Sequence, residues 1–72
     1  GRTYDLVRAN ILARPLIDLA QRIVWACKPG ACLVLSGLLE IQADSVEEAY
    51  MAQCLPKPRR VIDGEWCALV WD

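Results

Sequence analysis

The first half of the chain shows two spacings of apolar residues. The segment from Thr3 to Leu12 carries a short apolar run bounded by polar residues, which is typical of a β-strand. From Pro15 onward, apolar residues recur at intervals of three and four, which predicts a helix with one buried face. That face contains Leu16, Leu19, Ala20, Ile23 and Cys27. Proline suits the first turn, and Lys28-Pro29-Gly30 predicts the end of the helix.

The middle of the chain predicts a strand followed by a second helix. Cys32 to Leu35 is a continuous apolar run, short enough for a strand covered on both faces, and Ser36-Gly37 is expected to end it. The second helix is expected over roughly Ile41 to Cys54, with an inner face of Val46, Ala49, Tyr50 and Cys54. Its start is ambiguous: Ser45 with Glu48 fits a capping box, whereas Asp44 or a start nearer Glu40 are alternatives.

The last part of the chain predicts a hairpin. Asp63-Gly64 is a strong signal for a two-residue turn, here between strands over Lys57 to Ile62 and Glu65 to Trp71. Apolar residues fall on both faces of the final strand, so we expect it inside a sheet covered on both sides. Trp66 and Trp71 are accordingly expected in the core. The strand before it contains Arg59-Arg60 and suits the edge of the sheet.

Together these elements predict an α/β fold with four strands and two helices. A strand–helix–strand–helix series implies right-handed parallel crossovers. The hairpin then places the fourth strand antiparallel between its neighbours, so the expected order is first, second, fourth, third. This arrangement is half of a doubly wound, Rossmann-like sheet.

Composition and charge narrow the classes of function. With 72 residues there is room for at most one small domain, and a hydrophobic content of 56% excludes disorder. A formal net charge of −1 provides no broad cationic field for nucleic acid or an anionic membrane. No apolar run approaches the ~20 residues that cross a bilayer, and no signal-peptide pattern opens the chain. Histidine is absent, which excludes a Ser-His-Asp triad and a Cys2His2 zinc finger.

The chain contains four cysteines, and each occupies an apolar position of a periodic segment. They are Cys27, Cys32, Cys54 and Cys67. Their spacing lacks the two close C-x-x-C pairs of a zinc ribbon, so no metal site is expected. We interpret them as reduced core thiols in a cytoplasmic protein, with two disulfides as the alternative.

Candidate binding residues lie at the ends of the two parallel strands. Ligands of open α/β sheets bind outside the carboxyl ends of the strands, here Ala9-Asn10 and Ser36-Gly37. Asn10 is the best candidate, because a neutral amide orients an amino group without trapping it as an ammonium ion. Alternatively, Asn10 caps the turn into the helix at Pro15. Ser36 and Gly37 either line the same rim or form a strand-to-helix turn.

Several segments also match one known family in register along essentially the whole chain. They are Tyr4-Asp5-Leu6-Val7, Ala9-Asn10-Ile11-Leu12-Ala13, Pro15-Leu16, Lys28-Pro29-Gly30, Leu33-Val34-Leu35-Ser36-Gly37, Leu39, Gln42, Val46, Tyr50 and Gly64-Glu65-Trp66. On these residues the chain resembles the PrmA family of ribosomal-protein methyltransferases, which belongs to the class I S-adenosylmethionine-dependent superfamily and modifies large-subunit protein eleven. The family usually has a second glycine where this chain has Ala31.

The resemblance implies that residues 1–72 form a single partial domain, the C-terminal part of a methyltransferase catalytic domain. It implies that Asn10 lies against S-adenosylmethionine and that Ile11 and Leu12 wall the methyl-transfer pocket, with Ser36 and Gly37 beside them. The implied acceptors are amino groups of a ribosomal protein, on lysine side chains and at the N-terminus. Methyl transfer needs no nucleophilic residue, and none is assigned. Because the chain lacks the glycine-rich G-x-G pattern, we expect it to be inactive alone.

Two other classes of function remain open at this point. One is an α/β scaffold that self-associates through an uncovered sheet edge. The other is a piece of a different Rossmann-like enzyme, such as a dehydrogenase. The basic run of Lys57, Arg59 and Arg60 is expected to keep an edge strand soluble rather than to contact RNA. Trp25 lies on the polar side of the first helix and indicates either an interface or burial beneath a loop.

Overall fold

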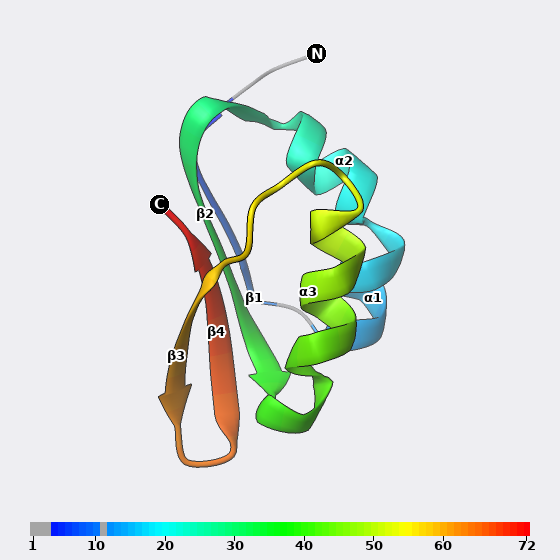
Figure 1. The fold of residues 1–72 in the computed structure, drawn as a ribbon, viewed down its shortest axis with the longest axis vertical. Helices are drawn as coiled ribbons and strands as arrows, with labels where there is room; N and C mark the ends of the chain where they lie inside the picture. Colours follow the sequence, from blue (N-terminus) through cyan, green and yellow to red (C-terminus); the bar gives the residue numbers. More distant parts are fainter. Residues whose placement is uncertain (1–3, 11) are drawn as a thin grey trace.

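A computed structural model describes residues 4–10 and 12–72. It consists of one four-stranded sheet with three α-helices on one face (Figure 1). The elements are β1 (Tyr4–Asn10), α1 (Ala13–Asp18), α2 (Ala20–Trp25), β2 (Cys27–Leu39), the 3-10 helix η1 (Glu40–Gln42), α3 (Ala43–Met51), β3 (Arg59–Asp63) and β4 (Trp66–Trp71). No helix in the described part of the chain is long and apolar enough to cross a membrane.

The strand order is β1-β2-β4-β3, as the sequence predicts. β1 pairs with β2 in parallel, and β4 is antiparallel to both β2 and β3. The basic strand β3 pairs only with β4 among the described strands, so its expected edge position is confirmed. The chain therefore folds as the mixed four-stranded α/β sheet that the sequence predicts.

The core lies between the sheet and the helices. Cross-strand partners that share this face include Leu35 of β2 and Leu69 of β4, which are both 0% exposed. Tyr50 of α3 is also fully buried, and its hydroxyl donates a hydrogen bond to the carbonyl of Leu16 at 2.9 Å. Its ring lies 5.6 Å from that of Trp71, centroid to centroid. Trp71 is 6% exposed, which confirms its expected core position.

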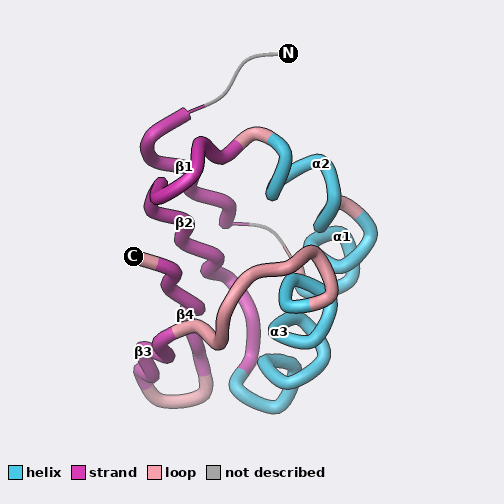
Figure 2. Tube along the Cα trace, turned by 45° about the horizontal axis from the view of Figure 1, so that its top comes forward, coloured by secondary structure: helices cyan, strands magenta, loops and turns pink. Residues whose placement is uncertain are grey.

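The other face of the sheet has no helix on it in the described part of the chain (Figure 2). Leu6, Val61 and Trp66 remain about half exposed there, at 50%, 47% and 55%. The expectations of cover on both faces and of a buried Trp66 are therefore wrong for this chain. The physical reason is topological. Both crossovers are right-handed and run across the sheet in the same direction, which places their helices on the same side.

The first helix predicted from the sequence is two helices in the structure. α1 and α2 meet at Leu19, whose backbone angles are φ −98° and ψ 5°. The Tyr50 hydroxyl binds the Leu16 carbonyl, which in an uninterrupted helix would accept from the amide of Ala20. A side chain inserted into the helical hydrogen-bond ladder is a recognised cause of such bends. Cys27, expected on this helix, instead begins β2.

β2 is longer than predicted and continues through Ser36-Gly37 to Leu39. Gly37 has φ +83°, and the register between β2 and β4 shifts between Leu35 and Leu38. This is a β-bulge, and glycine accommodates it because it lacks a Cβ. The expected end of the strand at this dipeptide is wrong, because pairing with β4 continues after pairing with β1 has ended.

Of the expected starts of the second helix, the one nearer Glu40 is confirmed, because η1 begins at Glu40 and runs directly into α3. The side-chain oxygen of Gln42 accepts the amide of Leu39 at 2.9 Å, and η1 leads into the helix. Ser45 and Glu48 therefore lie inside α3 rather than at its cap. Val46 is buried as predicted, whereas Cys54 lies beyond the helix and is exposed, with φ +69°.

The hairpin turn begins one residue later than predicted. Asp63 pairs with Trp66, so the turn is Gly64-Glu65. All four cysteines are free thiols, but only Cys67 belongs to the buried core; the others are half-buried or exposed. The expectation of a core position therefore holds for Cys67 and in part for Cys27, which packs against the core, and it is wrong for the exposed Cys54.

Candidate functional site

The carboxyl ends of β1 and β2 meet at one rim of the sheet. Asn10 and Ser36 form the last pair of the parallel ladder, as expected from an α/β topology. The hydroxyl of Ser36 is half-buried and lies 3.5 Å from the carbonyl of Ala9. The side chain of Asn10 and the whole of Ile11 lie outside the described residues. The structure thus brings the two predicted strand ends together through the backbone.

The helix that follows β1 has Leu12 as its N-cap residue. Leu12 makes no side-chain capping hydrogen bond and is 71% exposed. Because the side chain of Asn10 lies outside the described residues, both expectations for it, a binding role and a role in capping the turn into this helix, stay predictions.

The bulge at Gly37 shapes the rim on the β2 side. After it, β2 pairs again with β4, at Leu38 with Cys67 and at Leu39 with Trp66. Trp66 is thereby carried to the same end of the sheet as Ser36, with its indole more than half exposed. The sequence pattern predicted a core position for Trp66, because alternation alone does not say which face is covered. Its place directly after the hairpin turn is the signal that could have located it at the rim.

A shallow groove of about 290 Å³ lies beside the rim, between α1 and the start of α3. It is lined by Ala13, Arg14, Ile17, Ile41, Gln42 and Ser45. Ile41 is 88% exposed, although its backbone is held firmly. On one side of it the amide of Glu40 donates to the carbonyl of Glu65 at 2.8 Å, and on the other Gln42 binds the amide of Leu39. This segment therefore presents an apolar side chain to solvent from a fixed position.

Charged groups around the hairpin serve the fold rather than the rim. The Arg60 guanidinium lies 2.6 Å from Asp44 and 3.0 Å from Glu47, so it ties β3 to α3. The hydrogen bonds that Arg60 donates to these two carboxylates raise its pKa. Arg59 pairs with Asp72 at 2.8 Å on the surface. The two arginines of the basic run thus make intramolecular ion pairs on an edge strand.

Neither Ser36 nor Gly37 lines any of the grooves found among the described residues, so the rim is an open edge of the sheet rather than an enclosed cavity. Within the described residues, no group of His, Cys, Asp and Glu side chains is arranged to hold a metal ion. Another groove, about 410 Å³, lies at the other end of the sheet and includes Gly30. Gly30 is six residues before Ser36 along β2, or roughly 20 Å for an extended strand. The predicted site and this groove are therefore different places.

The comparisons with known proteins all indicate one family, and the matches extend over nearly the whole chain. A family model described as ribosomal protein L11 methyltransferase (PrmA) matches residues 1–72. A ribosomal protein L11 methyltransferase of a Caulobacter species is 51% identical over 67 residues, which cover 93% of this chain and 23% of that protein. The corresponding protein of Chloroflexus aurantiacus is 40% identical over 68 residues, covering 94% of this chain and 21% of its own length.

The fold of the chain also matches a solved structure. A crystal structure of ribosomal protein L11 methylase from Lactobacillus delbrueckii subsp. bulgaricus aligns with a TM-score of 0.88 and 26% identity. The alignment covers 97% of this chain and 36% of that one. The chain thus spans about a quarter of the length of the curated relatives it matches. The match sets aside the alternative of a different Rossmann-like enzyme.

Proposed function

The chain belongs to the ribosomal protein L11 methyltransferase (PrmA) family, and we propose that it forms the C-terminal part of a domain that methylates amino groups of ribosomal protein L11. The proposed methyl donor is S-adenosylmethionine, and the proposed acceptors are lysine side chains and an N-terminal amine. The observation that carries this proposal is the meeting of Asn10 and Ser36 at the carboxyl ends of parallel strands. Ligands of open α/β sheets bind at that position.

The residues at the rim suit such a donor and acceptor. The last pair of the parallel ladder is Asn10 and Ser36, whose side chains carry an amide and a hydroxyl. Neither side chain has a formal charge that would repel a sulfonium ion or an approaching amine. S-adenosylmethionine supplies the electrophilic methyl group when bound. We assign to Asn10 the orientation of an amino group, to Ile11 and Leu12 the wall of the transfer pocket, and to Ser36 and Gly37 the adjoining rim. Trp66 extends this wall from β4.

Catalysis by this wall rests on positioning. In-line transfer places the attacking nitrogen ~3–3.5 Å from the methyl carbon, and this orientation together with exclusion of water supplies most of the rate enhancement. Apolar side chains at the rim favour the uncharged amine over its ammonium form, because a desolvated cation is costly. No nucleophilic side chain is needed, and none is proposed.

The chain alone is not expected to bind the cofactor. Its glycines are Gly1, Gly30, Gly37 and Gly64, none of which forms the G-x-G pattern of a phosphate- or nucleoside-binding loop. Isothermal titration of S-adenosylmethionine into the chain should give no measurable heat of binding. A micromolar dissociation constant would contradict this part of the proposal.

The activity is tested in a chimera that joins this chain to the upstream part of the Caulobacter relative. Purified L11 and tritiated S-adenosylmethionine are the substrates, and mass spectrometry identifies the methylated amines. We expect transfer to L11, and Asn10→Ala should lower kcat/KM by roughly a hundredfold or more, because it removes an orienting contact. Gln53→Ala is the matched control, an amide in the turn after α3, and should leave the rate within about twofold. A folded chimera without transfer would refute the proposal.

A second candidate function is self-association, favoured by the exposed apolar face of the sheet. Leu6, Val61 and Trp66 are about half exposed, and β1 pairs on one side only within the described residues. Such an edge and face are a template for pairing with another copy. Sedimentation velocity at increasing concentration tests this: a dimer supports the scaffold, and a monomer throughout rules it out.

We also propose that the protein works in the cytoplasm. The support is chemical: four free thiols, three of them outside the buried core, persist in a reducing compartment. Thiol counting with a maleimide reagent in freshly lysed cells should label all four cysteines. Protection of two or more thiols that is reversed by a reductant would argue for an oxidising compartment.

A further inference from the structure

A groove lies at the end of the sheet opposite the proposed methyl-transfer site, and nothing in that function uses it. It measures about 410 Å³, and an adjoining groove of about 240 Å³ shares Gly30, Ala31, Leu55 and Trp71 with it. The two therefore form one continuous trough, which we call the amino-end trough. It runs between the start of β2, the loop after α3 and the last residues of β4.

The floor of the amino-end trough is apolar and held in place. Trp71 donates its indole N–H to the carbonyl of Pro56 at 2.6 Å, which fixes the loop that forms one wall. The same ring stacks in a tilted geometry against Tyr50, which is itself hydrogen-bonded to α1. Leu55 and Val70 complete the floor. A preformed apolar floor lowers the ordering cost of binding.

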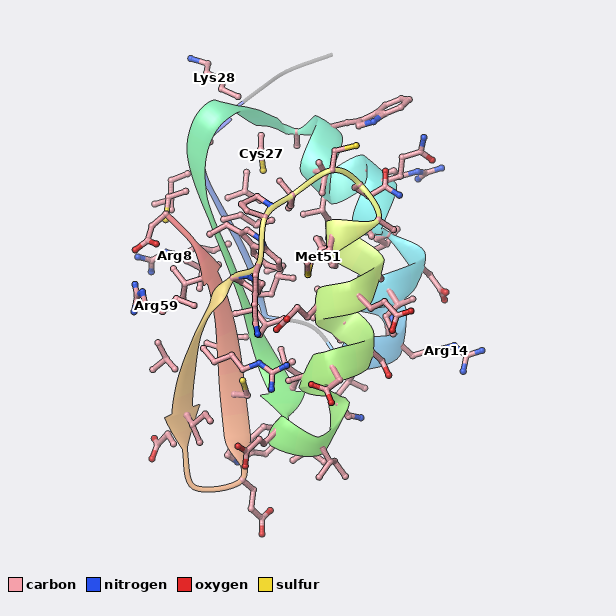
Figure 3. All side chains as sticks on the ribbon, viewed as in Figure 1. Arg8, Arg14, Cys27, Lys28, Met51 and Arg59 are labelled. Carbon is pink, nitrogen blue, oxygen red and sulfur yellow. The ribbon has the colours of Figure 1, made fainter. Side chains whose placement is uncertain are left out.

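The rim of the amino-end trough is cationic. Lys28, Lys57 and Arg59 line it, and Asp72 is the one acidic residue among the lining residues. This local excess of positive charge contrasts with a formal net charge of −1 for the whole chain. Figure 3 shows Lys28 at the top of the view beside the start of β2 and Arg59 projecting to the left of the sheet about halfway down, whereas Arg14 projects from the outer side of α1. The field at the trough therefore favours an anionic partner.

We propose that the amino-end trough docks an acidic polypeptide segment, with an apolar side chain beside Leu55 and carboxylates beside Lys57 and Arg59. Charge complementarity selects carboxylates, and the apolar floor selects a chain that carries side chains of both kinds. Nucleic acid fits less well, because Trp71 is only 6% exposed and offers no open ring face for a base. The surface is independent of the rim at Asn10.

The experiment uses this chain and a fluorescein-labelled octapeptide of alternating leucine and glutamate, with anisotropy as the readout. We expect a dissociation constant on the order of 10–100 µM at low salt, weakened severalfold by raising the ionic strength. The matched peptide with lysine in place of glutamate should bind at least tenfold more weakly. A serine–glutamate peptide, which lacks the apolar side chains, should also lose at least fivefold.

Variants locate the binding on the chain. Lys57→Glu should weaken binding of the leucine–glutamate peptide about tenfold, whereas Arg14→Glu, the same charge change on α1, should alter it less than twofold. Asp72→Asn releases Arg59 from its ion pair and should tighten binding about threefold, a gain that misfolding does not produce. Equal effects of Lys57→Glu and Arg14→Glu, unchanged binding in Asp72→Asn, or tighter binding of an oligothymidylate than of the peptide would each overturn the proposal.

Discussion

The hydrogen bond from Tyr50 to Leu16 leads to a prediction that separates the stability contributed by the phenol hydroxyl from that contributed by the ring. Tyr50→Phe keeps the buried ring and its contact with Trp71 but removes the hydroxyl that donates to the Leu16 carbonyl at 2.9 Å. The carbonyl is then left without that partner in a fully buried position. The cost of losing one partner of a buried hydrogen bond is about 1–3 kcal/mol, and we expect a loss of this size at pH 7.

The same hydroxyl gives the prediction a pH dependence with a definite sign. Burial, with a smaller contribution from the Cys27 thiol, raises the pKa of Tyr50 from 10.0 to about 12. Because the folded-state pKa lies above the unfolded value, the stabilisation is fully present below pH 10 and is lost as pH rises towards 12. A pKa difference of one between the folded and unfolded states corresponds to about 1.4 kcal/mol, so the native chain should lose about 2–3 kcal/mol over this interval.

The assay is urea unfolding followed by circular dichroism at a series of pH values from neutral to alkaline. Phenylalanine does not titrate, so the free energies of unfolding of the native chain and of Tyr50→Phe should converge as the pH rises above 10. Ser45→Ala removes an exposed hydroxyl from the same helix and should stay within about 0.5 kcal/mol of the native chain throughout. A constant difference between native and Tyr50→Phe across this range would refute the reasoning.

Three further perturbations test other parts of the fold by the same unfolding assay. Arg60→Ala should cost about 1–2 kcal/mol, because it leaves the nearly buried carboxylate of Glu47 without its cation. Arg59→Ala removes an exposed ion pair and should cost less than about 1 kcal/mol. Equal losses in the two variants would contradict this reasoning. Trp71→Ala should cost about 3–5 kcal/mol and Trp66→Ala about 1 kcal/mol or less, and the reverse order would show that the covered face has been misassigned. Gly37→Ala should cost about 1–2 kcal/mol, since φ +83° strains any residue with a Cβ, and a neutral result would argue against the bulge.

The strand order was predictable because it depends on local signals and on chirality. The hairpin signal at Asp63-Gly64 located the antiparallel pair to within one residue. The handedness of parallel crossovers then left one place for β4. The rim was predictable for the same reason, since the ends of parallel strands meet at one edge whatever their side chains. These features need no knowledge of distant contacts.

Other features depend on partners far away in the sequence, and periodicity does not report them. The break at Leu19 accompanies a hydrogen bond from Tyr50, which lies 34 residues after its acceptor. The length of β2 is set by pairing with β4, which continues beyond the bulge at Gly37. The sequence predicted that Gly37 ends the strand. Glycine is found both at strand ends and in bulges within strands, so the residue type alone does not separate these two cases.

The misassignment of Trp66 has a similar cause. Alternation shows that a side chain suits burial, but it does not show whether any element is available to cover it. Both helical crossovers lie on one side of the sheet, so the indole at the rim remains exposed. The error moved a candidate wall residue into the core, and only the topology of the whole sheet corrects it.

The central claim is that Asn10 marks the cofactor-binding end of this sheet. The most direct test is isothermal titration of S-adenosylmethionine into the chimera with the Caulobacter relative, with native Asn10 and with Asn10→Ala. We predict saturable binding to the native chimera and at least a tenfold rise in the dissociation constant on substitution, since one lost orienting contact is worth about 1.4 kcal/mol or more. An unchanged dissociation constant in a folded Asn10→Ala chimera would contradict the claim.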